Sequence, residues 1–144
     1  MIKRANTEDA EALAALAIQM WAGNDLDELA EEFRDLMERE DTACFLTYQD
    51  NEPIAFAQCQ LRHDYVEGTN SSPIGYLEGI FVSEGYRKRG YAAELLAECE
   101  KWAKEKGCTE FASDCELENV DSQRFHLAMG FKEANRIICF TKEL

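Results

Sequence analysis

Long hydrophobic runs are missing from this chain of 144 residues. The longest one, residues 12–18, is far shorter than the roughly 20 apolar residues that a membrane-spanning helix needs. Glu8, Asp9 and Glu11 precede it, and acidic residues are not typical of the start of a secretory signal peptide. We therefore expect no association with membranes and a location in the cytoplasm.

Basic residues are also scarce. The chain has 15 Lys and Arg residues against 29 Asp and Glu residues, which gives a net charge of −14 and an isoelectric point near 4.5. A general nucleic-acid-binding protein needs a basic surface that replaces the counterions of the phosphates, so this class is excluded. The negative charge favours a cationic partner or substrate, and a need for solubility explains it equally well.

Groups of residues with the spacing of a metal site are absent. There are only two histidines, His63 and His126, and no Cys-x-x-Cys pair, so we expect no metal cofactor. In the absence of an export signal, free cysteines in apolar surroundings are expected to be reduced and buried as small hydrophobic side chains. The six cysteines are Cys44, Cys59, Cys99, Cys108, Cys115 and Cys139.

No repeat, low-complexity stretch or linker rich in proline and glycine divides the chain, and its length suits one domain over residues 1–144. The order of its elements implies crossover connections around a mixed sheet, and so an α/β or α+β fold. Hydrophobic spacing predicts strands at 1–5, 42–48, 53–62, 74–82, 109–115 and 131–142, and helices at 7–21, 26–37, 90–106 and 119–129.

The predicted strand at 74–82 contains an irregularity. Its apolar sequence is interrupted by Glu78 and Gly79. A glycine inside a strand indicates a β-bulge or the close approach of another group to the backbone.

A basic cluster of Arg87, Lys88 and Arg89 follows this strand, in a chain whose first 60 residues carry 14 acidic and only 4 basic side chains. The cluster lies where the strand passes into a helix, and the first turn of a helix offers unpaired N–H groups and a positive dipole end. Gly90 and the small Ala92 leave the backbone accessible. The segment therefore predicts a pyrophosphate-binding loop, with an exposed basic turn as the alternative.

Three better-known motifs are absent. Gly85 and Gly90 have the spacing of a triphosphate-binding loop, but Tyr91 and Ala92 replace the Lys and Ser/Thr that hold the γ-phosphate and Mg²⁺. The dinucleotide fingerprint G-x-G-x-x-G is missing. So is G-x-S-x-G, and no Cys–His pair suggests a covalent acyl-enzyme.

At this loop the sequence resembles the GNAT superfamily of N-acetyltransferases, whose acetyl-CoA motif is R/Q-x-x-G-x-G/A. The matching residues are Val82-x₄-Arg87-x-x-Gly90-x-Ala92, and Asn119 and the closing Gly130-Phe131 also fit the family's order. More narrowly, the chain resembles the bacterial aminoglycoside 6′-N-acetyltransferases. That likeness is carried by Arg62-His-Asp-Tyr65, Ser71-Ser-Pro73, Leu77-Glu-Gly-Ile-Phe-Val82 and Phe111-Ala-Ser-Asp114.

The resemblance implies a mixed, mostly antiparallel sheet that splays at the fourth strand and is flanked by helices. Acetyl-CoA, the co-substrate, would lie in the splay, with its pyrophosphate on the backbone of the basic loop. The cofactor-binding residues implied are Ile80, Phe81, Val82, Arg87, Lys88, Arg89, Gly90, Tyr91, Ala92 and Asn119.

The resemblance also implies an acceptor pocket for a cationic aminoglycoside. Its residues would be Trp21, Asn24, Tyr65, Glu78, Asp114 and position 135, where the relatives compared have Glu and this chain has Asn135. Each of these residues also has an explanation without a binding role. Glu78 and Asp114 could be carboxylates exposed to water at strand ends, and Trp21 could be a core aromatic.

Direct transfer in a ternary complex is the chemistry that these residues favour. Glu78 is the candidate base that takes the ammonium proton, and a backbone N–H of the splayed strand, such as that of Val82, would stabilise the oxyanion. Many GNAT enzymes have a general-acid Tyr at the position of His126, so His126 is a candidate proton donor. A structural histidine is the alternative.

The C-terminal run of Ile137, Ile138, Cys139 and Phe140 predicts a homodimer, since the resemblance implies pairing through this region. A packed internal strand explains the same residues.

For the whole chain, the resemblance implies acetylation of the 6′-amine and antibiotic resistance. An acetyltransferase for a polyamine or amino acid, and a non-catalytic module that binds CoA or a basic partner, remain open.

Overall fold

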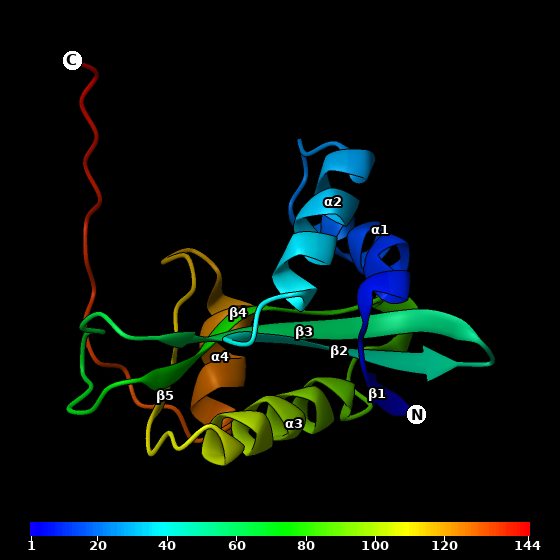
Figure 1. Cartoon of the computed structure of the whole chain (residues 1–144). Helices are drawn as coiled ribbons and strands as arrows, with labels where there is room; N and C mark the ends of the chain where they lie inside the picture. Colours follow the sequence, from blue (N-terminus) through cyan, green and yellow to red (C-terminus); the bar gives the residue numbers. More distant parts are fainter.

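A five-stranded sheet, with strands in the order β1-β2-β3-β4-β5, runs through the centre of the computed structural model, which describes all 144 residues (Figure 1). Neighbouring strands are antiparallel except for the parallel pair of β4 and β5. The predicted mixed, mostly antiparallel sheet is confirmed. The strands are β1 (Ile2–Arg4), β2 (Thr42–Gln49), β3 (Glu52–Arg62), β4 (Ile74–Val82) and β5 (Phe111–Ser113).

Helices α1 (Ala10–Met20) and α2 (Leu26–Met37) cover one face of the sheet (Figure 1). Their apolar stripes pack on Leu46 and Phe56 of the strands, which is why the 3.6-residue spacing is visible in the sequence. A short 3₁₀ turn (Thr7–Asp9) precedes α1, so the regular helix begins three residues later than predicted.

Helices α3 (Tyr91–Glu105) and α4 (Val120–Ala128) lie on the opposite face (Figure 1). The buried side of α3 carries Leu95, Leu96, Cys99 and Trp102, and these residues pack on Leu77 of β4. A second 3₁₀ turn (Glu84–Tyr86) joins β4 to the loop before α3. No helix in the structure is both long enough and apolar enough to cross a membrane.

The prediction of buried cysteines is confirmed for Cys44, Cys59, Cys99 and Cys108. Burial raises the pKa of Cys44 to about 12, so this thiol stays protonated and unreactive. The prediction is wrong for Cys115 and Cys139, which are exposed, because neither lies in an element that packs on the sheet.

A β-bulge interrupts β4 at the predicted place. Gln58 of β3 pairs with Gly79 and Cys59 pairs with Leu77, which leaves Glu78 as the extra residue. As a result the backbone changes phase: the N–H of Gly75 donates toward β5, to the Glu110 carbonyl, whereas the N–H of Ser83, eight residues later, donates toward β3, to the Ile54 carbonyl. In a regular strand, two N–H groups eight residues apart would point to the same side.

The predicted strand at 131–142 is wrong. Residues 131–144 form no helix or strand, and Figure 1 shows the C-terminal segment running away from the sheet. Ile137, Ile138 and Phe140 are 75%, 80% and 86% exposed. Apolar β-forming residues make a strand only beside another strand edge, and no strand of this chain pairs with them.

Candidate active site

The gap between β4 and β5 is the first part of the candidate site. Pairing of the two strands ends at Leu77 and Ser113, so the rest of β4 has no neighbour on that side. The N–H of Ser83 points to β3, and N–H directions alternate along a strand, so the N–H groups of Ile80 and Val82 point into the gap. An extended ligand with amide groups could pair with this edge.

The loop that leads into α3 is the second part. Lys88 and Gly90 have φ values of 63° and 88°, in the left-handed region, and Gly90 precedes the first residue of the helix. The N–H groups of residues 88–93 have no backbone acceptor. Consecutive free N–H groups in such a turn, at the positive end of a helix dipole, form a binding site for a phosphate group.

Arg87 stabilises this loop from within. Its Nε donates to the Val82 carbonyl at 2.9 Å, and its guanidinium lies 5.7 Å from the centre of the Phe81 ring. Arg89 lies 5.6 Å from the centre of the Tyr86 ring. Both arginine side chains thus make contacts within the protein, whereas the backbone N–H groups of residues 88–93 stay free.

Of three other residues expected near the cofactor, two have hydrogen-bond partners of their own. The Tyr91 hydroxyl donates to Gln49 Oε1 at 3.0 Å, which ties the first turn of α3 to the end of β2. Asn119 caps α4, where its side chain accepts from the Ser122 N–H at 3.1 Å. Ala92 follows Tyr91 in the first turn of α3 and is half-buried.

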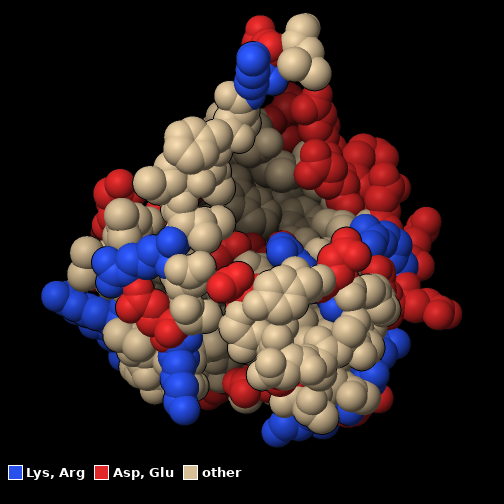
Figure 2. Space-filling model, turned by 90° about the vertical axis from the view of Figure 1, so that its left-hand side faces the viewer, with Lys and Arg blue, Asp and Glu red and all other residues tan.

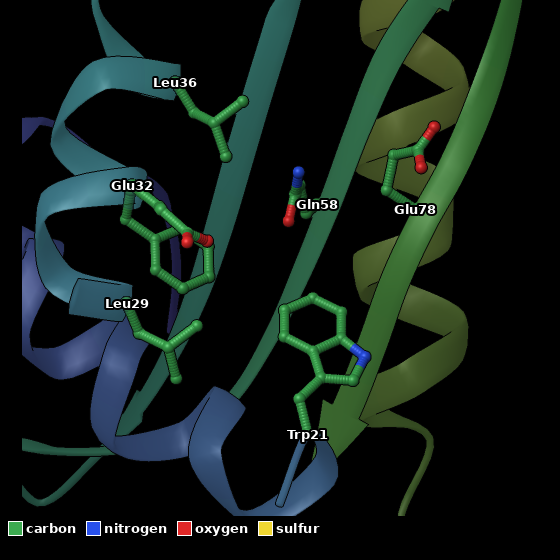
Figure 3. A pocket seen from close by; sticks show the side chains of 7 residues that line it. Trp21, Leu29, Glu32, Leu36, Gln58 and Glu78 are labelled. Atoms are coloured by element: carbon green, nitrogen blue, oxygen red, sulfur yellow. The ribbon is translucent and has the colours of Figure 1, made fainter. Parts of the chain in front are cut away.

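A cavity of about 210 Å³ lies between α2 and the sheet, on the face that α1 and α2 cover (Figure 3). Helix α2 carries five acidic side chains, and Figure 2 shows a deep hollow in the surface with acidic side chains along one side of its rim. Such surroundings attract a cation. The cavity is lined by Trp21, Leu29, Glu32, Phe33, Leu36, Gln58 and Glu78.

The carboxylate of Glu78 is held by Arg62. Arg62 Nη2 donates to Glu78 Oε1 at 2.7 Å and to Oε2 at 3.1 Å, and Nε donates to Oε1 at 3.1 Å. Since a carboxylate has about four acceptor positions, Oε2 keeps room for a further donor. The guanidinium also stacks on Tyr76, 3.5 Å from the ring centre.

Asp114 belongs to the same network. The Tyr76 hydroxyl donates to Asp114 Oδ2 at 2.5 Å, and burial together with this hydrogen bond raises the pKa of Tyr76 well above its usual range. The two predicted carboxylates, Glu78 and Asp114, are thus linked through Arg62 and Tyr76. Arg62 and Tyr76 were not predicted as site residues. Side chains alternate along a strand, so Arg62 lies on the same face of β3 as Gln58, and Tyr76 lies two residues before Glu78 on β4.

The other predicted acceptor residues separate into two groups. Trp21 lines the cavity and covers Gly79, where an added Cβ would lie 2.9 Å from the indole. Asn24 donates to the Trp21 carbonyl at 2.8 Å. Tyr65 is 74% exposed in the 63–73 loop, and Asn135 donates to Glu67 of that loop, so neither lines the cavity.

His126 has a partner on each ring nitrogen. Nδ1 lies 2.7 Å from the Ser122 carbonyl, which can only accept, so Nδ1 carries a proton. Nε2 lies 2.8 Å from the hydroxyl of Ser113, the last residue of β5 before the gap.

No three His, Cys, Asp or Glu side chains are grouped closely enough to hold a metal ion.

Residues 10–131 match the family model described as the Acetyltransferase (GNAT) family. The chain is 38% identical to an aminoglycoside N(6′)-acetyltransferase type 1 of Serratia marcescens, over 100% of this chain and 99% of that one. It is 40% identical to the protein of the same name from Acinetobacter baumannii, over 90% of this chain and 89% of the relative.

Solved structures agree with the sequence relatives. The aminoglycoside acetyltransferase AAC(6′)-Iy in complex with a bisubstrate analogue, CoA-S-monomethyl-acetylneamine, superposes with a TM-score of 0.95 at 38% identity, over 100% of this chain and 98% of that one. The same protein in complex with CoA gives a TM-score of 0.96 at 38% identity, over 100% and 95% of the two chains.

Proposed function

Because this chain belongs to the GNAT family of acetyltransferases, and within it to the aminoglycoside N(6′)-acetyltransferases, we propose that it acetylates the 6′-amine of aminoglycosides with acetyl-CoA. One observation supports this assignment above the others. Glu78 is the residue at which the gap beside β4 begins, and it also lines the acidic cavity on the α1 and α2 face. A cofactor in the gap and a cationic acceptor in the cavity would meet there.

Acetyl-CoA binding is assigned to the backbone. The free N–H groups of residues 88–93 suit the pyrophosphate, and the exposed edge of β4 at Ile80, Phe81 and Val82 suits the amides of the pantetheine. We place Asn119, through the amide nitrogen that helix capping leaves unused, near the thiol end of the cofactor.

The reaction is a direct transfer. The ammonium gives one proton to Glu78, directly or through a water, and the neutral amine nitrogen attacks the thioester carbonyl carbon. The negative charge on the carbonyl oxygen is stabilised by the N–H of Val82, which points into the gap. The C–S bond then breaks, the CoA thiolate leaves, and the new amide nitrogen loses its second proton to water.

His126 is our candidate donor for the departing thiolate. Since Nδ1 is bound to the Ser122 carbonyl, only Nε2 could supply a proton, and it would pass through the Ser113 hydroxyl at the edge of the gap. In the neutral ring Nε2 accepts from Ser113, so this role requires the imidazolium.

The proposed function is tested by measuring release of CoA thiol from acetyl-CoA with a panel of amines. We expect turnover with aminoglycosides and little with polyamines or free amino acids, and mass spectrometry with NMR should place the acetyl group on the 6′-nitrogen. Thiol release with a polyamine alone would favour another small-amine acetyltransferase. No release with any amine would favour a non-catalytic module.

Changing Asp114 to Asn is expected to raise KM for the aminoglycoside and leave kcat nearly unchanged. The Asp114 carboxylate is exposed and accepts a hydrogen bond from Tyr76. It would bind the cationic acceptor equally well in the ground state and in the transition state, and loss of such uniform binding raises KM without lowering kcat. Steady-state kinetics checks this, with KM for acetyl-CoA as the internal control. A large fall in kcat would instead place Asp114 in the chemical step.

We also propose that the enzyme is a homodimer held together by its C-terminal segment. Ile137, Ile138 and Phe140 are exposed side by side, and exposed apolar groups of this kind normally mark an interface. Strand β5 leaves one edge unpaired, which a segment from a second copy could join.

Sedimentation of the wild-type protein at micromolar concentration is expected to give the mass of a dimer. Replacing Ile137, Ile138 and Phe140 together by Ser should halve that mass, because the change removes apolar contacts between copies while the sheet and helices stay intact. A wild-type monomer would overturn the proposal.

We place the enzyme in the cytoplasm, since its four buried cysteines are free thiols and such thiols suit a reducing compartment. Acetylation converts a charged ammonium into a neutral amide. We infer that this loss of charge confers resistance to the antibiotic.

A further inference from the structure

Gln58 is a buried polar side chain that has no partner within the protein. It lies on β3, is only 8% exposed, and its amide makes no hydrogen bond to any other residue. The only side-chain polar atoms sealed from solvent without a partner are Thr47 Oγ1 and Trp102 Nε1, so water still reaches the Gln58 amide through the cavity, and a bound group can replace that water. Figure 3 shows the amide projecting into the cavity between α2 and β4. A group that enters the cavity would provide the missing hydrogen bonds.

Glu32 faces the same space from the other side. It lies on α2, forms no ion pair, and is in the stripe that also contains Leu29 and Leu36 (Figure 3). Apart from Glu78, the other walls are apolar, formed by these two leucines, Phe33 and the indole of Trp21. Besides Glu78, the cavity therefore has a second anionic group, an amide with both a donor and an acceptor, and apolar surfaces between them.

This combination matches an amino sugar. A ring hydroxyl can donate to and accept from one amide, an ammonium group pairs with a carboxylate, and the C–H faces of the ring pack on apolar side chains. Glu78 is assigned to the reacting amine. Gln58 and Glu32 are therefore left for a part of the acceptor that does not react.

We propose that Gln58 and Glu32 form a second subsite that binds a ring hydroxyl and an ammonium group of the aminoglycoside beyond its reacting sugar. This inference rests on the proposed function. The subsite decides which acceptors are used well, since an acceptor without a second ring cannot fill it.

The test compares a two-ring acceptor, neamine, with a one-ring acceptor, 6-amino-6-deoxyglucose. Changing Gln58 to Leu keeps the shape and removes the amide, so kcat/KM for neamine is expected to fall by roughly five- to tenfold, the effect of one hydrogen bond. With the one-ring acceptor it should stay within about twofold of wild type. The melting temperature should stay nearly equal, because the amide makes no hydrogen bond to another residue that the change could break.

Changing Glu32 to Gln provides an independent arm, since this exposed position tolerates the change. We expect a rise in KM for neamine of about tenfold, and no rise for the one-ring acceptor. Glu31→Gln is the matched control: it removes the same charge from a position that does not line the cavity, where Glu31 pairs with Arg34, and should leave both acceptors unaffected.

Two outcomes overturn the subsite: equal losses with both acceptors, or no loss with either in a folded Gln58→Leu variant. Calorimetric titration of neamine, without acetyl-CoA, separates this inference from the proposed function. A wild-type protein that binds neamine but transfers no acetyl group would overturn the function and keep the subsite, provided that Gln58→Leu binds neamine more weakly. Unchanged neamine binding in that variant removes the subsite and leaves the function standing.

Discussion

Changing Glu78 to Gln is expected to lower kcat about 100-fold, with a parallel fall in kcat/KM, because the variant keeps the shape and loses the proton acceptor. Glu78 is the only acidic residue that both lines the cavity and lies where β4 separates from β5. Steady-state kinetics of the wild-type protein and the variant measures both parameters.

The ion pair with Arg62 requires its own control. Glu78→Gln breaks that pair, so the variant could lose activity because Arg62 is released from its place on Tyr76. Arg62→Gln breaks the same pair and keeps the carboxylate, and we expect it to lose less than about tenfold in kcat. If Glu78→Gln retains the wild-type kcat, Glu78 is not the base.

Changing Gly90 to Val is expected to weaken acetyl-CoA binding by about 100-fold. No other atom lies within 4 Å of where a Cβ on Gly90 would stand, so the space beside it is available to the pyrophosphate. A branched side chain there would occupy that space, and such steric insertions cost a few kcal/mol, roughly 2–3 here. Calorimetry with acetyl-CoA measures the change.

Gly107 provides a matched control at the other end of α3. It has a φ of 90° against 88° for Gly90, and it too has no atom within 4 Å of a Cβ. Valine at either position is strained in the same left-handed conformation, so both variants should lose similar thermal stability. Only the Gly90 variant should lose affinity. Equal affinity in the two folded variants would mean that the pyrophosphate binds elsewhere.

Much of this fold could be predicted because each element has its own signal. The stripe on α3 is visible as Leu95, Leu96, Cys99 and Trp102, and Gly79 marks the irregularity in β4. The turn with free N–H groups before α3 was also predictable, since a basic cluster with Gly90 between a strand and a helix is a local pattern.

The remainder depended on contacts between distant segments. The antiparallel pairing of β3 and β4 places Arg62 beside Glu78, and nothing near either residue in the sequence indicates that ion pair. The same is true of Tyr76 and Asp114, which belong to β4 and to the segment after β5. The prediction of a C-terminal strand was wrong for a related reason: its residues favour a strand, but a strand also needs the edge of another strand to pair with.

The bulge in β4 limits how this site can change during evolution. Leu77, Ile80 and Val82 all pack on the α3 side of the sheet, and Phe81 packs on the α1 side, which is possible only because Glu78 is an extra residue between them. Losing Glu78 would restore regular alternation, which keeps Leu77, Ile80 and Val82 on the α3 side but removes the bulge together with the proposed proton acceptor. One added residue would instead turn Ile80 and Val82 out of the core and the Val82 N–H away from the gap. Substitutions can alter acceptor preference gradually, whereas the loss or gain of one codon here removes the proposed proton acceptor or displaces the core residues and the proposed oxyanion donor in a single event. Lineages that diverge from this enzyme should therefore keep the length of β4 even where its side chains differ.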